Sequence, residues 1–469
     1  MLKSLTNTIV IKKTIKLTKK HPVLFSLLLF SLIVTAVSLI FFIRFPNNFL
    51  NPNFYAEDGK DYMANILNNG FLVSIFHTFN GYFIVGMYLL MGMAYLINFI
   101  LFQNQFVYLP ASIAIVSYIF LAFCVCLPAF LLKKELGVIW ATVLIIATAF
   151  VPLISSDYAI IGSIANLKWV FYYLGFCLII YRIYRYKADV RTIALVDIGI
   201  LICAYSNITV YLLYPLIFIP TIRDIYKSSN VMRALKGTLK TPQVVSALLL
   251  GILLLPQVIY IKINGIPKLP GYLDTQYEVS KTTELFVWRT YLYGIFYPYL
   301  HFFTDKISLI IMFIAASFMF VRSSKINRWI FLSGLYAAFI ATFLFTVNRP
   351  GVSQIFTRYT SSGPDQFFYA QNMIIILVLI IVLAQSKMEK PIELLLTGLI
   401  IIYIVASLPY SGTFGKNDFM HRDVGTIVEN TQKACENSKN DTISVQVYPI
   451  QDPYWSITTD RAYVCRGEK

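Results

Sequence analysis

The chain has 469 residues, of which 58% are hydrophobic and only 13% are charged. Soluble domains are about 45–50% apolar and about 25% charged, so this composition excludes a soluble globular protein and indicates a polytopic membrane protein. The formal net charge of +16 does not indicate nucleic-acid binding. Its Lys and Arg residues fall in short loops between apolar segments, which is the positive-inside pattern of membrane proteins.

The chain begins with a basic arm, residues 1–21, which we expect in the cytoplasm. The apolar segment 22–43 follows it and is long enough to cross a bilayer, which needs about 20 apolar residues. Because this segment is too long for a cleavable signal peptide, we interpret it as an uncleaved anchor.

Further basic clusters predict the cytoplasmic face of the remaining chain. They are Lys133-Lys134 and residues 182–191, 223–240, 322–328 and 387–390. Placing all of them on one face predicts a transmembrane module over residues 22–409 with the N-terminus inside and the C-terminus outside. Its eleven predicted spans lie near residues 22–43, 107–132, 137–155, 167–185, 193–206, 208–222, 244–263, 306–321, 329–347, 373–386 and 391–409.

Two apolar segments, 83–102 and 285–304, do not fit this count, because either one as a full span would move a basic loop to the wrong face. We therefore expect both to lie in the outer interface. The spans 193–206 and 208–222 are short, which predicts a broken helical hairpin around Ser206-Asn207.

The topology places residues 410–469 outside, as a small α+β appendage. Residues 442–448 alternate apolar and polar side chains, which predicts a strand. Cys435 and Cys465 lie in this polar segment, and an oxidising outer compartment favours a disulfide between them. The other four cysteines lie in apolar runs and are expected to pack as small side chains.

The acidic pair Glu57-Asp58 lies just beyond the first span, in the predicted outer loop 44–82. Negative charge near hydrocarbon is unfavourable, so such a pair often has a function. The alternative is a solvated acidic turn that begins a helix, with Asp58 or Asp61 as its cap.

The motif Tyr55-Ala56-Glu57-Asp58-Gly59, followed by Asn80-Gly81-Tyr82, resembles a pattern in bacterial membrane proteins of the GT-C glycosyltransferase type. At residue level the resemblance covers only residues 54–82 and 348–370, whereas the all-α architecture resembles GT-C enzymes over the whole chain. It implies a protein of the cytoplasmic (inner) membrane that moves a hexose, with glucose favoured. The donor would be a polyprenyl-phosphate sugar, and the acceptor an envelope glycan such as O-antigen on the outer face.

This chemistry needs a base for the acceptor hydroxyl, and either carboxylate of the pair can supply it. We favour Asp58 by analogy with GT-C enzymes, and Glu57 is the alternative. Two adjacent carboxylates separate their pKa values, so one stays ionised. Since no separate nucleophile is evident, we expect a single in-line attack with inversion.

The departing phosphate needs cations, and the planar guanidinium of arginine suits phosphate oxygens. We expect Arg358 first, then Arg349, both in the outer loop 348–372, and Lys168 at the start of a span. An arginine that snorkels to the interface is the alternative in each case. Sugar contacts are expected from Tyr359, Asn166, Trp169, His77, Tyr82 and Asn207, although Trp169 could instead be an interface anchor and His77 structural.

The sequence contains neither a Walker A motif nor G-x-G-x-x-G, which favours a lipid-carried donor over a nucleotide sugar. No cofactor is expected, and a divalent metal is the alternative. Asp157 is the only obvious later partner for a metal bound at the acidic pair, and hard cations need several oxygen ligands. Two alternatives stay open. One is an O-antigen polymerase or ligase, and the other is a flippase or transporter of a lipid-linked sugar, for which Asp197 would be the acid inside a span.

Overall fold

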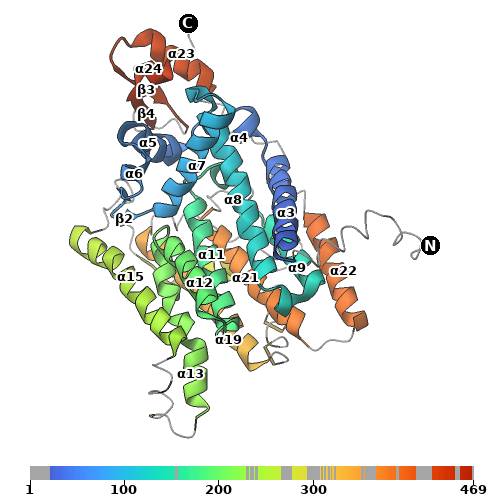
Figure 1. Cartoon of the computed structure of the whole chain (residues 1–469). Helices are drawn as coiled ribbons and strands as arrows, with labels where there is room; N and C mark the ends of the chain where they lie inside the picture. The colour runs from blue at the N-terminus through green and yellow to red at the C-terminus, as the bar shows by residue number, and fades with distance from the viewer. Residues whose placement is uncertain are drawn as a thin grey trace.

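The computed structural model describes residues 22–153, 157–228, 241–265, 277–292, 324–349, 366–386, 390–407, 425–448 and 455–466, with single residues between some of these ranges. The chain is mostly helical and has two short two-stranded sheets in its described part (Figure 1).

Seven helical segments in the described part are long and apolar enough to cross a membrane. This finding confirms a membrane protein, whereas the eleven crossings stay a prediction. The seven are α3 (Pro22–Arg44), α8 (Leu109–Leu131, preceded by the 3-10 turn η2, Phe106–Tyr108), α11 (Leu167–Tyr184), the continuous pair η3 (Ile208–Phe218) and α13 (Ile219–Tyr226), α15 (Pro242–Asn264), α19 (Lys325–Asn348) and α21 (Gln366–Gln385).

Helices also occupy three other predicted spans, as α9 (Lys133–Ala149), α12 (Val190–Ala204) and α22 (Lys390–Ser407). The predicted span 306–321 lies outside the described residues apart from single positions. Of the two predicted interfacial segments, the first is α7 (Val85–Leu101). The second is described only to residue 292, as α16 (Val279–Leu285) and the π-helix η4 (Phe286–Leu292).

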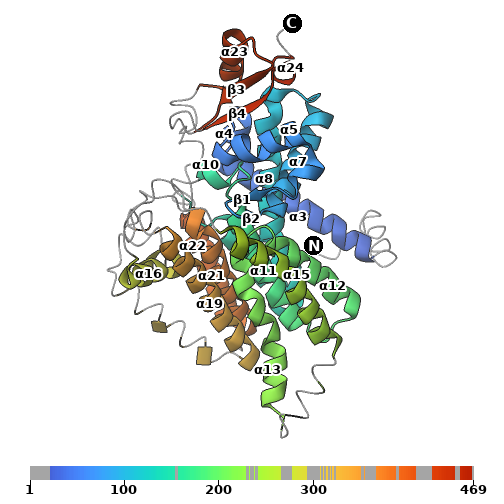
Figure 2. The ribbon, with the colours of Figure 1, turned by 90° about the vertical axis from the view of Figure 1, so that its left-hand side faces the viewer.

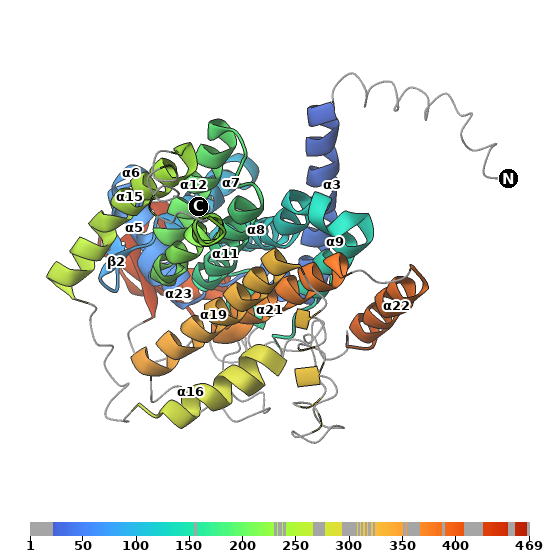
Figure 3. The ribbon, with the colours of Figure 1, turned by 90° about the horizontal axis from the view of Figure 1, so that it is seen from below.

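Helices α11 and α21 form the centre of the bundle, and nearly all their side chains are buried (Figure 3). A helix that is apolar on all sides belongs in such a core. Helix α3 lies at the edge and leaves Leu24, Leu28 and Leu32 exposed, as expected for a surface that faces lipid.

At one end of the bundle a polar network joins four helices that the basic loops predict to end on the same face. Arg185 forms an ion pair with Glu135 at 2.7 Å. The Tyr184 hydroxyl donates to Asn327, and the Asn327 amide donates to Gln385. The predicted inner ends of α9, α11, α19 and α21 therefore do lie together.

A buried ion pair joins α11 to α12. Arg182 Nε lies 2.5 Å from Asp197 Oδ1, and both side chains are almost fully buried. Arg182 also donates to the Gln243 carbonyl, and Ser246 donates to Asp197, so α15 completes the group. Asp197 is thus engaged in helix packing.

The opposite end of the bundle carries short elements of the first loop, with the C-terminal piece stacked above them (Figures 1 and 2). The β1 (Thr78–Phe79) and β2 (Tyr82–Phe83) strands form a hairpin whose two turn residues, Asn80 and Gly81, have φ of 49° and 81°. Asn-Gly is the preferred pair for such a turn, which requires positive φ at both positions. The remaining elements here are α4 (Asn47–Leu50), η1 (Asp58–Met63), α5 (Ala64–Asn69), α6 (Phe71–Ser74) and α10 (Asp157–Ile160).

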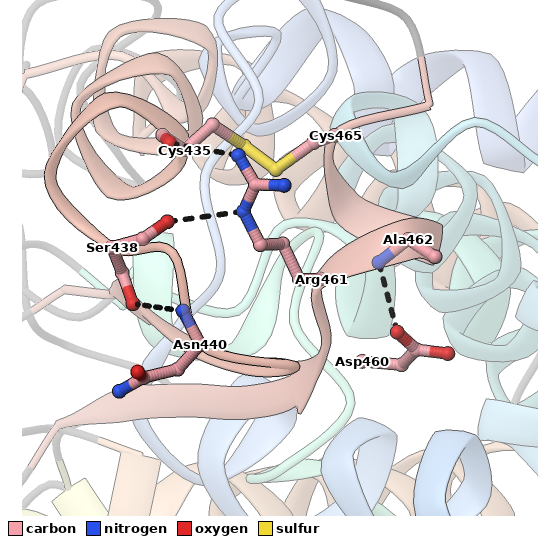
Figure 4. The surroundings of a disulfide bond; sticks show 7 residues. All are labelled: Cys435, Ser438, Asn440, Asp460, Arg461, Ala462 and Cys465. Carbon is pink, nitrogen blue, oxygen red and sulfur yellow. Dashed lines mark hydrogen bonds between the residues drawn. A yellow bond between two sulfur atoms is a disulfide. The ribbon is translucent and has the colours of Figure 1, made fainter.

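The C-terminal piece consists of α23 (Ile427–Asn437), β3 (Thr442–Gln446), β4 (Ser456–Asp460) and α24 (Arg461–Val464). The expected disulfide between Cys435 and Cys465 is present. Beside it, Arg461 donates to the carbonyls of Ser438 and Cys435, which satisfies the C-terminal end of α23 (Figure 4).

Candidate functional site

The acidic motif follows a distorted piece of backbone. Ala56 has a φ of 28°, a region that residues other than glycine rarely adopt. One residue further on, after Glu57, the π-helix η1 (Asp58–Met63) begins. Residues with unusual backbone dihedrals and π-helical turns both occur often at functional sites.

Asp58 is buried and bound to backbone. Its carboxylate accepts the N–H groups of Ile164, at 3.1 Å, and Ala165, at 2.7 Å. Burial raises the pKa of Asp58 from 3.8 to about 7, against the hydrogen bonds from Ile164 and Ala165, which lower it. With 1% of its surface exposed, Asp58 serves to fix the motif to the start of α11.

Glu57 and Asp61 are only partly buried. Glu57 interacts electrostatically with Asp61, with Tyr82 and with Lys168. Burial raises the pKa of Asp61 to about 6, and the charge of Glu57 acts in the same direction. A carboxyl group with a pKa near neutrality is suited to exchanging protons.

Lys168 lies in the first turn of α11 and is 7% exposed. Its ammonium lies 5.5 Å from the centroid of the Phe79 ring, and within the described part of the chain it forms no salt bridge. A cation at a helix N-terminus opposes the helix dipole, so negative charge nearby is needed to keep it ionised. Glu57 and Asp61 supply such charge.

Arg349, at the end of α19, approaches the same place from another helix. It interacts electrostatically with both Lys168 and Tyr82. Its guanidinium lies 5.0 Å from the centroid of the Phe367 ring, which also meets Trp169 edge to face at 5.6 Å. The ends of α11, α19 and α21 are therefore joined by this cation and aromatic contacts.

Tyr82 completes the group from the β1–β2 hairpin. Burial raises the pKa of its phenol to about 12, while the positive charge of Arg349 lowers it. Its hydroxyl therefore keeps its proton at neutral pH and can donate a hydrogen bond to a ligand. The structure thus brings Glu57, Asp58, Tyr82, Lys168, Trp169 and Arg349 into one neighbourhood, which we call the acid–cation cluster together with Asp61.

The other predicted site residues are not shown in the acid–cation cluster. Asn166 and Asn207 make structural contacts. The Asn166 amide donates to the Ala159 carbonyl at 3.1 Å, and the Asn207 amide donates to the Lys168 carbonyl at 2.7 Å. Both fix the start of α11. His77 is exposed, and its backbone N–H donates to the Ser74 carbonyl at 2.9 Å. Arg358 and Tyr359 lie outside the described residues.

One member of the acid–cation cluster, Asp61, was considered from the sequence only as a helix cap. Asp61 is four positions after Glu57, a spacing that places side chains on one face of a helix, so this signal was available. Arg289 is fully buried in η4, with its guanidinium 5.9 Å from the centroid of the Phe368 ring. Its aromatic-rich segment gave no signal beyond that of an interfacial helix.

Across the described ranges, no group of three or more His, Cys, Asp or Glu side chains is placed to hold a metal ion. Comparison with known proteins gives no relative. No protein-family model matches the chain, and neither the curated proteins nor the solved structures contain a match.

Proposed function

We propose that the protein is a membrane glycosyltransferase that moves a hexose from a polyprenyl-phosphate carrier to an envelope glycan on the outer face of the membrane. The supporting observation is the acid–cation cluster at the end of the bundle that carries the first loop. There the buried Lys168 interacts electrostatically with the carboxylates of Glu57 and Asp61 and with Arg349.

The charge pattern of the cluster suits phosphate as a leaving group. Lys168 lies in a largely desolvated position without a salt bridge in the described part of the chain. An ionised group in such a position is unfavourable unless it is paired, and a phosphate oxyanion would pair it. Arg349 would supply a second contact to the same phosphate.

Glu57 is the better base in this arrangement, which revises the preference for Asp58. Asp58 is buried and already accepts two backbone hydrogen bonds, so it cannot easily approach a substrate hydroxyl. Glu57 is partly exposed and has no hydrogen bond from the described residues to its carboxylate. We therefore propose that Glu57 accepts the proton and that Asp58 positions the motif.

The reaction would be one in-line displacement. The acceptor hydroxyl oxygen forms a bond to the anomeric carbon as the bond from that carbon to the phosphate oxygen breaks. The hydroxyl proton passes to Glu57, and the polyprenyl phosphate leaves with the bonding electrons, held by Lys168 and Arg349. Trp169 would place an aromatic ring beside the sugar.

The transporter alternative receives less support. It predicted charged residues buried within spans, with Asp197 as the main acid, and this acid is paired with Arg182 in helix packing. No observation on the described residues favours a polymerase or ligase over a single hexose transfer.

The test is transfer of radiolabelled hexose from polyprenyl-phosphate hexose to envelope glycan by the purified protein in vesicles. We expect Glu57→Gln to lower kcat by about 10²–10⁴-fold, the usual contribution of a general base. Glu436→Gln, an exposed acid in α23, is the matched control. Wild-type protein inactive with every polyprenyl-phosphate hexose, or equal activity for Glu57→Gln and Glu436→Gln, would overturn the proposal.

A further inference from the structure

The C-terminal piece is bound to the first half of the chain at several places. The Asn53 amide donates to the Gly425 carbonyl at 3.1 Å, and the Asn68 amide donates to the Thr458 carbonyl at 2.9 Å. These bonds join residues more than 350 positions apart, on both sides of the acidic motif. The piece is therefore docked on the motif itself.

The central contact is a backbone bridge between the end of β3 and the residues that lead into the motif. Tyr448 N donates to the Phe54 carbonyl at 3.0 Å, and Ala56 N donates to the Tyr448 carbonyl at 2.5 Å. Tyr55 and Tyr448 thus form an isolated parallel β-bridge.

The bridge holds the residue that has the least favourable backbone in the motif. Ala56 at φ 28° occupies a region that is disfavoured for alanine by about 5- to 30-fold in population. Side chains also pack tightly against the motif here, because a Cβ on Gly59 would lie 3.0 Å from Phe54 Cβ and from Val447 Cγ1. On the far side, Asp58 is fixed to the start of α11.

We propose that the bridge at Tyr448 positions Glu57. By keeping Ala56 in its unusual conformation, the C-terminal piece would direct Glu57 toward Lys168, while Asp58 anchors the other end of the motif. Tyr448 is then a positioning residue that acts through its backbone. The catalytic consequence rests on the proposed transferase function, but the placement of Glu57 does not.

Two substitutions at one position isolate the bridge. Tyr448→Pro removes the N–H that donates to Phe54, whereas Tyr448→Ala removes only the side chain and keeps both backbone bonds. Each is combined with Ala56→Gly, because glycine adopts positive φ without penalty and no longer needs the bridge. If the bridge acts by keeping Ala56 at positive φ, adding Ala56→Gly to Tyr448→Pro should restore the wild-type labelling rate and kcat.

The first measurement does not depend on transfer. In a Glu57→Cys background, we would measure how fast a membrane-impermeant, negatively charged thiosulfonate labels the new thiol. We expect Tyr448→Pro to change the rate by about 5- to 30-fold, Tyr448→Ala to leave it within about twofold, and Ala56→Gly to restore it. The four buried free cysteines are controlled for by labelling the protein without Glu57→Cys.

The second measurement uses Glu57 intact. Tyr448→Pro should lower kcat by a similar factor with little change in the donor KM, and Ala56→Gly should recover it. A general loss of folding would instead not be rescued by Ala56→Gly. An unchanged labelling rate in Tyr448→Pro, or a change that Ala56→Gly does not restore, would overturn the proposal.

If transfer is absent even in wild type, the proposed function fails, while the labelling rates still decide the positioning role. If Tyr448→Pro does not yield monodisperse protein, the double variant Cys435→Ser/Cys465→Ser replaces it, because it loosens the C-terminal piece, and with it the bridge, without substituting a residue of the bridge. The same shift and the same rescue by Ala56→Gly are expected. A labelling rate of Glu57→Cys equal to that in the protein with the intact disulfide would count against the proposal.

Discussion

Asp58 Oδ1 accepts the backbone N–H of Ala165 at 2.7 Å, across 107 positions of sequence. This bond ties the acidic motif of the first loop to the segment that begins α11, the helix that carries Lys168. The hydrogen bond of Asp58 therefore fixes the positions of both Glu57 and Lys168, and a substitution of Asp58 should affect both residues.

Asp58 should make stability depend on pH. Its pKa is about 7 in the folded protein against 3.8 as the ordinary value. Between these values the folded state binds more protons, so stability falls as the pH rises from about 4 to about 7. Asp58→Asn should remove this dependence, on the order of a few kcal/mol. We would compare unfolding temperatures in detergent at pH 5 and pH 8, with the exposed Asp441→Asn as control. A pH difference as large in Asp58→Asn as in wild type would contradict the expectation.

Asp58→Ala should behave differently from Asp58→Asn. Alanine leaves the N–H groups of Ile164 and Ala165 without their acceptor, and each buried unsatisfied donor is unfavourable by about 1–3 kcal/mol. We expect a lower unfolding temperature at both pH values. Asparagine retains an oxygen acceptor, so equal losses for the two variants would show that these bonds contribute little.

Lys168→Met should weaken donor binding without reducing stability. The substitution removes a buried charge but keeps the apolar stem that packs in the first turn of α11. We expect the donor KM to rise at least about tenfold, which corresponds to about 1.4 kcal/mol, with an unfolding temperature equal to or above that of wild type. Lys439→Met on the exposed surface of the C-terminal piece is the control. A normal donor KM would remove Lys168 from the site.

The Arg182–Asp197 pair should be important for stability alone. Replacing one partner leaves a buried charge unpaired, which typically destabilises by about 3–5 kcal/mol. Arg182→Met and Asp197→Leu should each lower the unfolding temperature, and the double variant should recover most of the loss. Transfer per folded molecule should stay at the wild-type level in the double variant. A transport role for Asp197 would instead abolish function in every variant.

The Cys435–Cys465 disulfide should stabilise the docked C-terminal piece. It closes a loop with a sequence separation of 30, for which a constraint of about 3 kcal/mol is typical. Cys435→Ser/Cys465→Ser should speed hydrogen exchange in residues 425–448 and 455–466, and leave α11 and α21 unchanged. Treatment of wild type with an impermeant reductant should give the same pattern. Uniform acceleration over all helices would mean that the piece unfolds only with the whole protein.

Local sequence patterns predicted many elements correctly. The apolar runs at 22–43, 107–132 and 244–263 are helices because a bilayer requires backbone hydrogen bonds to be satisfied within the segment. The break at Ser206-Asn207 also occurs, since the Asn207 side chain accepts the Thr209 N–H and begins η3. By contrast, the sequence could not decide between Asp58 and Glu57 as the base, because two neighbouring carboxylates have nearly the same local sequence.

The sequence by itself determined that this is a membrane protein, where its apolar helices lie and which cysteines can meet outside the bundle. These properties follow from composition and short-range periodicity. Only the tertiary structure decided that Asp58 is buried and bonded to Ala165, that Glu57 interacts electrostatically with Lys168, and that the Ala56 N–H donates to the Tyr448 carbonyl. Each depends on contacts between segments more than 100 positions apart. Such contacts are stabilised by burial and hydrogen bonding between distant residues, which local sequence patterns do not predict.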